Sequence, residues 1–247
     1  MKNTCLILFA IMVLVPLTQS CKNPDNKINF KKEGYISLFN GKDLTGWKIP
    51  EGDNGHWKVV DGVIDYDAKS ESREELGWGE KSLQSEKIFK NYQLRVEWRF
   101  KGYSGLFKMP VILPNGDYAR DTLGNVVYFM RPNSDSGINL RKGHQVNIWC
   151  WGCGSGEIWG SRFESMPPEV KEAAVPKFHA DYPVGEWNTF DITLKGNLVC
   201  VYLNDILVIQ ECPLIDMPQE GTIGRQHHGG KGAESIIQFR NIWVKEL

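Results

Sequence analysis

The chain has 247 residues and a formal net charge of −1 at pH 7, which argues against nucleic acid or a charged membrane surface as its main partner. Once an N-terminal leader is set aside, the remainder has the length of one ordinary domain. Nine tryptophans give the chain a high aromatic content, and this content needs an explanation.

The N-terminus reads as an export signal. Lys2 precedes an apolar run over residues 6–17, which is too short to span a membrane, and Ser20 precedes Cys21. Residues 1–20 are therefore predicted to be a signal peptide, and "LTQSC" resembles the lipidation site of a bacterial lipoprotein, with Cys21 carrying the lipid. We expect a chain held in the cell envelope, periplasmic or at the outer-membrane surface, that meets the membrane only through this anchor. Cleavage and secretion is the alternative.

Residues 21–33 are polar and lack periodicity, which predicts a flexible tether before a single domain at 34–247. Besides the anchor, the mature chain has Cys150, Cys153, Cys200 and Cys212. We expect these to be strand residues or to form one local disulfide, and their pairing stays open. The spacing of Cys150 and Cys153 resembles half of a zinc or redox site, but no second such pair completes it.

Short runs of alternating apolar and polar residues, separated by Gly, Asn, Asp and Pro, dominate the domain. This pattern predicts an all-β fold, a jelly-roll sandwich of two antiparallel sheets with long loops. A short helix is expected only at Pro168–Ala174. The clearest predicted strands are Trp57–Val60, Val63–Tyr66, Tyr92–Phe100, Ser136–Arg141, Gln145–Cys150, Trp187–Lys195, Leu198–Leu203, Ile206–Gln210, Gly221–Gln226 and Ser235–Lys245.

Alternation predicts which side of its own sheet each side chain occupies. In "NYQLRVEWRF" the four apolar residues should enter the core, and the charged residues between them should face outward. The residues expected inside are Leu94, Val96, Trp98, Phe100, Ile138, Leu140, Val146, Ile148, Cys150 and Phe239, and those expected outside are Arg95, Glu97, Arg99, Asn139, Arg141, Gln145, Asn147, Trp149 and Arg240.

The stretch "HQVNIWCWGCGSGEIWGSR" concentrates Trp149, Trp151 and Trp159 beside polar side chains. Aromatic rings cover the C–H face of a sugar, and amides or guanidinium groups bind its hydroxyls. We interpret this stretch as part of a carbohydrate site. A second hydrophobic layer beneath a loop is the alternative.

The paired carboxylates of ordinary glycosidases are missing, because Trp159 occupies the place where an aspartate would complete the pattern in "GEIWGSRFE". Near neutral pH, histidines and carboxylates can still transfer protons. The candidate ionisable residues are Glu97, Asp135, Glu157, His227 and His228, with Arg141, Arg225 and Arg240 as electrostatic partners.

Ten segments follow in the order typical of the 3-keto-disaccharide hydrolase domain family, which this chain resembles from Tyr35 to Leu247. They include "ISLFNGKDLTGWK", "WKVVDGVI", "SDSGINLR", "EWNTFDITLKGN" and "GTIGRQHHG". The resemblance implies a concanavalin A-like jelly roll and a secreted lipoprotein of the kind found in Bacteroidota.

The implied activity is cleavage of glycosides oxidised to a ketone at C3. The ketone makes the C2 proton acidic, so a base can remove it, the C1 substituent leaves by elimination, and water adds to the product. Such a site needs a base, a group that stabilises the enolate oxygen, and an acid that protonates the leaving group. This reaction does not require the carboxylate pair that the sequence lacks.

Carried over residue by residue, the resemblance implies catalytic roles for His228, Glu157 and Glu97, with His228 or Glu157 transferring the proton. Arg141 and Arg240 become candidates for binding an oxyanion or a hydroxyl. The full set of expected substrate-binding residues is Asn139, Arg141, Gln145, Asn147, Trp149, Trp159, Gln226, His227 and Arg240.

Several departures from the family pattern imply a different substrate from that of its commonest members: Gln145, Asn147, Cys150 and His227 replace other residues. Residues 101–132 form a long insertion that we interpret as a lid shaping a subsite. A lectin-like module that binds a glycan without turnover is the main alternative, and a tethered structural domain is a third. No cofactor is implied, although a divalent metal is possible.

Overall fold

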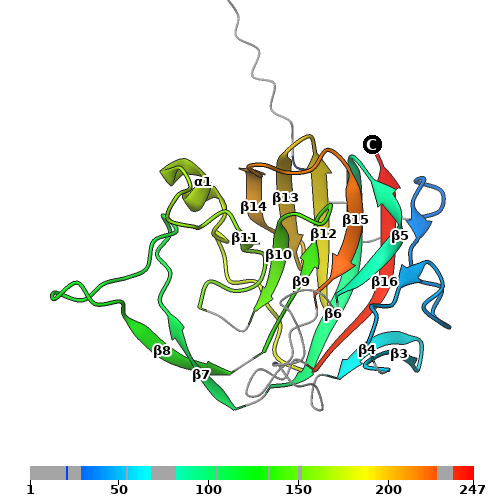
Figure 1. Cartoon of the computed structure of the whole chain (residues 1–247), viewed down its shortest axis with the longest axis horizontal. Helices are drawn as coiled ribbons and strands as arrows, with labels where there is room; N and C mark the ends of the chain where they lie inside the picture. The colour runs from blue at the N-terminus through cyan, green and yellow to red at the C-terminus, as the bar shows by residue number, and fades with distance from the viewer. Residues whose placement is uncertain are drawn as a thin grey trace, which may run out of the picture.

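The structure is a computed structural model that describes Cys21 and residues 29–53, 55–67, 82–103, 105–132, 134–149, 152–226 and 236–247. Its described elements are almost all strands (Figure 1). They are β1 (Ile36–Ser37), β2 (Trp47–Lys48), β3 (Trp57–Val60), β4 (Val63–Asp67), β5 (Leu83–Phe89), β6 (Tyr92–Gly102), β7 (Leu106–Pro110), β8 (Tyr128–Pro132), β9 (Asp135–Asn139), β10 (Gln145–Trp149), β11 (Ile158–Trp159), α1 (Pro168–Ala173), β12 (Asn188–Lys195), β13 (Leu198–Leu203), β14 (Ile206–Pro213), β15 (Gly221–Arg225) and β16 (Ile236–Glu246).

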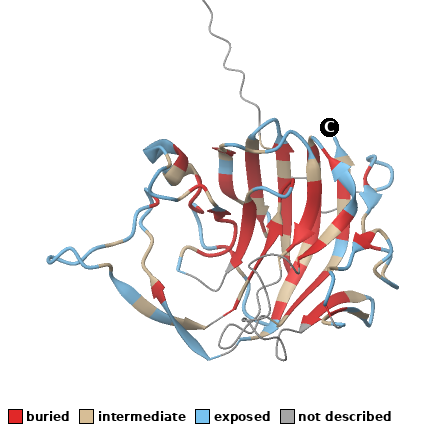
Figure 2. Cartoon of the chain, in the orientation of Figure 1, coloured by how far each residue is buried: buried red, intermediate tan, exposed pale blue. Residues whose placement is uncertain are grey.

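Two antiparallel sheets pack face to face, as the strand pattern predicted. The eight-stranded sheet has the order β14-β13-β12-β6-β16-β4-β3, with β1 paired to β16. The six-stranded sheet has the order β11-β10-β9-β15-β5-β2. One hydrophobic core between them draws on both sheets, for example Phe190 and Phe239 from the first and Ile138 and Ile148 from the second. Figure 2 shows the buried residues gathered in these strands.

The alternation assigned the inward residues of β6 correctly. Leu94, Val96, Trp98 and Phe100 are all buried in the core. The opposite face of the strand carries charged residues that form ion pairs with neighbouring strands. Each outward residue of β6 thus lies on the exterior of its own sheet. Alternation alone does not predict which of the two sheets a strand joins.

The turns explain where several strands end. Asn204 and Asp205 have φ of 50° and 66°, as the two central residues of a tight hairpin turn require, and they connect β13 to β14. Arg141 and Lys142 also have positive φ, 46° and 63°, and this tight turn ends β9 at Asn139, two residues before the predicted end.

Residues 105–132 contain two strands where the sequence indicated only a long insertion. Strands β7 and β8 pair over their whole length as a separate two-stranded hairpin, which extends away from the sandwich at the lower left of Figure 1. Its far end returns to the body, where Lys171 of α1 forms an ion pair with Asp117 at 2.5 Å. We call residues 105–132 the arm. The arm, β5 and the short strands β1, β2 and β11 are the elements missing from the predicted strands.

The packed part of the chain begins within the predicted tether, since the Phe30 ring stacks on Trp243 with centroids 5.3 Å apart. Cys21 forms a disulfide with Cys200, and Tyr202 Oη donates to the Cys21 carbonyl at 2.8 Å. This disagrees with the expected lipidation of Cys21, because a sulfur bonded to Cys200 cannot also carry a thioether-linked lipid. The predicted signal peptide, residues 1–20, lies outside the described residues.

Within the described ranges, no helix has the length and apolar character needed to cross a membrane.

Candidate functional site

A network of amide side chains covers the outer face of the six-stranded sheet. Gln145 Nε2 donates to Asn147 Oδ1 at 2.6 Å and to Gln226 Oε1 at 2.8 Å. Both Gln145 and Asn147 belong to β10 and are buried despite facing away from the core. Gly137 of β9 makes room for them, because a Cβ there would overlap the Gln145 side chain. The resulting polar layer contains amide groups of the kind that bind hydroxyls.

Glu157 enters this network from the loop before β11. Its backbone carbonyl accepts from Asn147 N at 2.8 Å, so the loop continues the sheet beside β10. One carboxylate oxygen accepts from Asn147 Nδ2 at 3.1 Å, and the other accepts from Arg162 Nε in an ion pair. Glu157 has 0% exposed surface. These two contacts hold the buried carboxylate in place.

Asp135 lies at the start of β9, on the same outer face as Gly137, and pairs in register with Trp149. The pKa of its carboxyl is raised well above the usual value, firstly by burial and secondly by the negative charge of Glu157. The two acids therefore differ in state. Glu157 is paired with a cation, while Asp135 keeps its proton to a higher pH than an ordinary aspartate.

The remaining members of this face line its edges. Asn139 and Trp159 are each in register with Gln145, on either side of β10, and so share its face. Trp159 is 45% exposed and meets Phe163 edge to face, with ring centroids 5.5 Å apart. An exposed aromatic ring beside amide groups is the arrangement expected of a sugar platform.

The arm closes one side of this face. Arg162, the partner of Glu157, donates to the carbonyl of Gly116 at 3.4 Å, and its guanidinium carbon lies 5.6 Å from the centre of the Tyr118 ring. Nearer the sandwich, a Cβ on Gly152 would lie 3.0 Å from the Phe129 ring. The insertion therefore supports the charged partner of Glu157; that it shapes a subsite stays a prediction.

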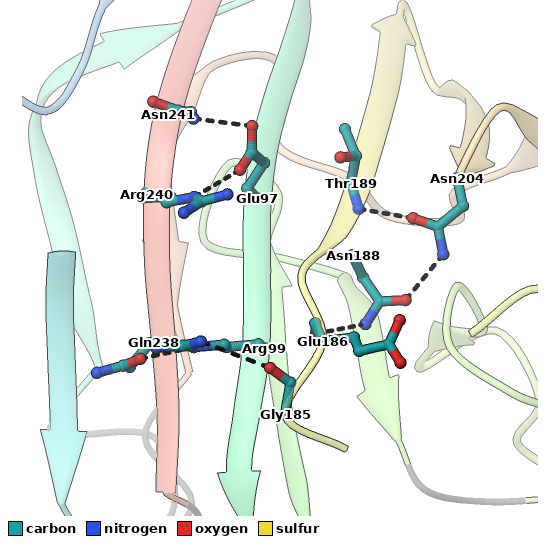
Figure 3. Close-up of polar contacts among 10 residues, drawn as sticks. All are labelled: Glu97, Arg99, Gly185, Glu186, Asn188, Thr189, Asn204, Gln238, Arg240 and Asn241. Atoms are coloured by element: carbon teal, nitrogen blue, oxygen red, sulfur yellow. Dashed lines mark hydrogen bonds and ion pairs between the residues drawn. The ribbon is translucent and has the colours of Figure 1, made fainter. Parts of the chain in front are cut away.

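Glu97 and Arg240 are not part of this face. They lie on the exterior of the eight-stranded sheet, where Arg240 Nε donates to Glu97 Oε2 at 2.6 Å and Asn241 donates to the other oxygen (Figure 3). Because the core separates the two sheets, these residues point away from Glu157. The expectation that Glu97, Arg240 and Glu157 converge on one surface is wrong.

Arg141 does not face a site either. It is 2% exposed, and its guanidinium group donates to the backbone carbonyls of Lys90, Gly196 and Pro218. These carbonyls belong to turns at one end of the sandwich. Arg141 therefore ties these turns together, and its two terminal nitrogens donate within the fold instead of to an oxyanion.

His227 and His228 lie outside the described residues, as do Cys150, Trp151 and the side chain of Trp149. The sequence analysis did not identify Arg162 as the partner of Glu157, although an arginine five residues after a candidate glutamate indicates a possible ion pair. Across the described ranges, no three His, Cys, Asp or Glu side chains gather closely enough to hold a metal ion.

A sequence model of the 3-keto-alpha-glucoside-1,2-lyase-like domain matches residues 34–245. The chain is 25% identical over 252 residues to the 3-keto-disaccharide hydrolase of Bacteroides thetaiotaomicron, an alignment that covers 87% of this chain and 79% of that protein.

Two solved structures from Parabacteroides distasonis ATCC 8503, each described provisionally as a glycosyl hydrolase, share the fold. The first has a TM-score of 0.54 at 23% identity and covers 87% of this chain and 84% of its own. The second has a TM-score of 0.52 at 22% identity and covers 88% and 95%.

Proposed function

Because this chain belongs to the 3-keto-alpha-glucoside-1,2-lyase-like domain family, and is thus a glycosidase-type enzyme, we propose that its substrates are glycosides whose sugar carries a ketone at C3. We place the reaction on the outer face of the six-stranded sheet, between Trp159 and the arm. The observation that carries this proposal is the neighbouring pair of carboxyl groups on one polar surface: Glu157 forms an ion pair with Arg162, and the pKa of Asp135 is raised by burial and by Glu157.

The pair supplies an acid without supplying a nucleophile. Glu157 has no exposed surface, and both of its oxygens are engaged, so it cannot attack C1 of a sugar. Its negative charge instead raises the pKa of Asp135. We therefore assign Asp135 as the proton donor and Glu157 as the positioning residue that keeps it protonated. This revises the expectation that Glu157 itself transfers the proton.

The reaction then proceeds by elimination and hydration. A base removes the proton at C2, and the electron pair passes into the C3 carbonyl to form an enolate. When the enolate collapses, the C1–O bond breaks and Asp135 protonates the departing oxygen. Water adds to the C1=C2 double bond, placing OH at C1 and H at C2, and releases the 3-keto sugar. General acid–base groups contribute about 10²–10⁴-fold each to such steps.

We propose His228 as the base at C2. It follows Gln226 by two residues, and Gln226 bonds directly to Gln145 in the amide network. An unperturbed imidazole titrates near neutral pH, which suits a base of moderate strength acting on an already acidified C–H. The amides of Asn139 and Gln145 are proposed to bind sugar hydroxyls, with Trp159 beneath the ring. Asn147, which has 0% exposed surface, holds Gln145 and Glu157 in place.

The test is turnover of a panel of 3-keto glycosides and their unoxidised counterparts by the purified chain in heavy water, followed by NMR. We expect cleavage of the 3-keto compounds only, with deuterium at C2 of the released sugar. Cleavage of unoxidised glycosides without exchange would remove the elimination mechanism. Saturable sugar binding without turnover of any compound would favour a lectin.

The Glu157→Gln variant tests the role of Glu157 in holding the proton on Asp135. Removing the negative charge lowers the pKa of Asp135, and so does leaving Arg162 without its counter-charge. The acid form is then lost at lower pH. We therefore expect the high-pH limb of the kcat/KM profile to move to lower pH, measured between pH 5 and pH 9 with a 3-keto glycoside, in about half-unit steps.

The control for this variant is Glu164→Gln, which neutralises an exposed glutamate in the same segment and should leave the profile unchanged. Because breaking a buried ion pair can cost about 3–5 kcal/mol, thermal unfolding is recorded for both variants, and Glu157→Gln is combined with Arg162→Met if it unfolds early. A folded Glu157→Gln variant whose high-pH limb stays in place would contradict the assignment.

A further inference from the structure

The amide network on the outer face of the six-stranded sheet has a direction, and Glu157 sets it. Glu157 pairs with Arg162 as a carboxylate, and a carboxylate can only accept hydrogen bonds. Asn147 must therefore turn its NH2 group toward Glu157, at 3.1 Å, and its carbonyl oxygen away from it. An amide side chain can usually be turned either way, but here the neighbouring carboxylate fixes its orientation.

This direction passes from Asn147 to Gln226 through Gln145. The oxygen of Asn147 accepts from Gln145 Nε2 at 2.6 Å, so Gln145 presents its NH2 group to the network. The same nitrogen lies 2.8 Å from the Gln226 side chain, which must therefore turn its own oxygen, Oε1, toward Gln145. Gln145 reaches Gln226 by lying over Gly137, the in-register partner of Asn147, where a Cβ would overlap the Gln145 side chain.

The network ends in a free donor, the NH2 group of Gln226. Because its oxygen is bound by Gln145, its two N–H bonds point elsewhere, and Nε2 has no hydrogen-bond partner in the described part of the chain. Gln226 is partly exposed, and this nitrogen is not shut off from solvent. The backbone of Gln226 is fixed, since its N donates to the Gly137 carbonyl at 2.8 Å and its carbonyl accepts from Ser136 Oγ at 2.9 Å. The face therefore offers an oriented N–H donor to a ligand.

Gln226 and Asp135 flank one small area of the face. Gln226 lies across from Gly137, and Asp135 stands two residues before Gly137 on β9, on the same outer face. With about 3.3 Å per residue along a strand and about 4.8 Å between strands, the Cα atoms of Gln226 and Asp135 are about 8 Å apart. An acid acting at the oxygen on C1 and a donor acting at the oxygen on C3 must lie on either side of C2. The spacing allows both side chains to reach one pyranose ring.

The proposed reaction needs a donor for the enolate oxygen, and the two arginines expected there, Arg141 and Arg240, lie elsewhere. Resting on the proposed function, we propose that Gln226 is a catalytic residue whose Nε2 donates a hydrogen bond to the C3 oxygen as the enolate forms. When the base removes the C2 proton, negative charge moves onto this oxygen, and a fixed N–H dipole directed at it stabilises the transition state more than the ketone. Gln145 and Asn147 are positioning residues that keep the NH2 group of Gln226 turned outward.

Enolate formation is measured without cleavage on the 3-keto derivative of 1,5-anhydroglucitol, which has no leaving group at C1. NMR follows the exchange of its C2 proton for deuterium in heavy water, at saturating substrate, and kcat/KM for methyl 3-keto-glucoside is measured beside it. We expect Gln226→Leu to lower both by about 10²–10³-fold, the usual cost of removing one oxyanion donor. Gln226→Glu, which keeps the acceptor for Gln145 but presents an oxygen to the enolate, should lose at least as much. Gln210→Leu, the same change at an exposed position on β14, should leave both rates unchanged.

The Gln145→Met variant tests the orienting step. It removes the bond that turns Gln226 but leaves the donor, so C2 exchange should fall by less than about tenfold, and thermal unfolding is recorded for every variant. Wild-type exchange rates in a folded Gln226→Leu variant, or an equal loss in Gln145→Met and Gln226→Leu, would overturn the role of Gln226 and leave the proposed function standing. A wild type that neither cleaves methyl 3-keto-glucoside nor exchanges the C2 proton of either compound would refute the proposed function, and the role of Gln226 with it.

Discussion

Replacing Asp135 by asparagine is expected to lower kcat/KM for a methyl 3-keto-glycoside by about 10²–10⁴-fold, the usual contribution of a general acid. Asparagine has nearly the same shape but cannot protonate a departing methoxide. The loss should be much smaller with 4-nitrophenyl 3-keto-glucoside, whose leaving group departs without help from an acid. Steady-state kinetics with the two substrates measure both effects.

Thermal unfolding separates this loss from a loss of fold. The native pKa of Asp135 is raised above its unfolded value of 3.8, so its contribution to stability is complete below that value and is lost as pH rises through the native pKa. At neutral pH the asparagine variant should therefore be at least as stable as the wild type.

Asp61→Asn serves as the matched control, because Asp61 is an exposed turn residue with a φ of 50° that asparagine tolerates. Activity of Asp135→Asn within threefold of this control, on both substrates, would show that the acid is elsewhere.

The fold followed from the sequence because its signal is local. Alternation along β6 and β10 depends only on neighbouring residues, and the structure confirms it at Leu94, Trp98, Val146 and Ile148. The arm was missed because β7 and β8 pair with each other across the long connection 111–127 and bury little of their surface. These two strands are held by hydrogen bonds to each other, so their sequences show only a weak alternation of apolar and polar residues.

The site was predictable only in part, because a sandwich has two exteriors. Glu97 and Asn147 both face outward, yet they belong to different sheets, and strand order is set by long-range pairing that alternation does not encode. Arg141 was assigned outward as the last residue of the predicted strand Ser136–Arg141, but β9 ends at Asn139. Arg141 instead folds back through a turn with positive φ and binds backbone carbonyls, because a tight turn reorients the side chains that follow a strand.

The same ambiguity applies to Arg225, which sequence reasoning treated as an electrostatic partner. It lies on β15 and points into the core, where its guanidinium carbon is 5.0 Å from the Trp47 ring centre and 5.6 Å from that of Phe239. Nη1 donates to the Gly224 carbonyl at 3.1 Å, but Nε and Nη2 have no hydrogen-bond partner in the described part of the chain. Burial lowers its pKa to about 9.

Replacing Arg225 by methionine is expected to raise the free energy of unfolding at pH 7 by about 1–4 kcal/mol, the range found when buried charges are exchanged for apolar residues. For a chain of this size this corresponds to roughly 2–4 °C in Tm per kcal/mol. Methionine keeps much of the arginine's length and contact with both rings, but it leaves no unsatisfied donors. Thermal and urea unfolding measure the change.

The pH dependence of that difference identifies its cause. A cation whose native pKa lies below its unfolded value destabilises the fold fully below about pH 9, and the cost is relieved as pH rises from there toward the unfolded pKa. The advantage of Arg225→Met over the wild type should therefore shrink above pH 9. Arg120→Met, at an exposed position on the arm, should change stability by less than about 0.5 kcal/mol at every pH. If Arg225→Met instead unfolds more readily than the wild type, the contacts of the cation with Trp47 and Phe239 outweigh its burial, and the core depends on a charge for its stability.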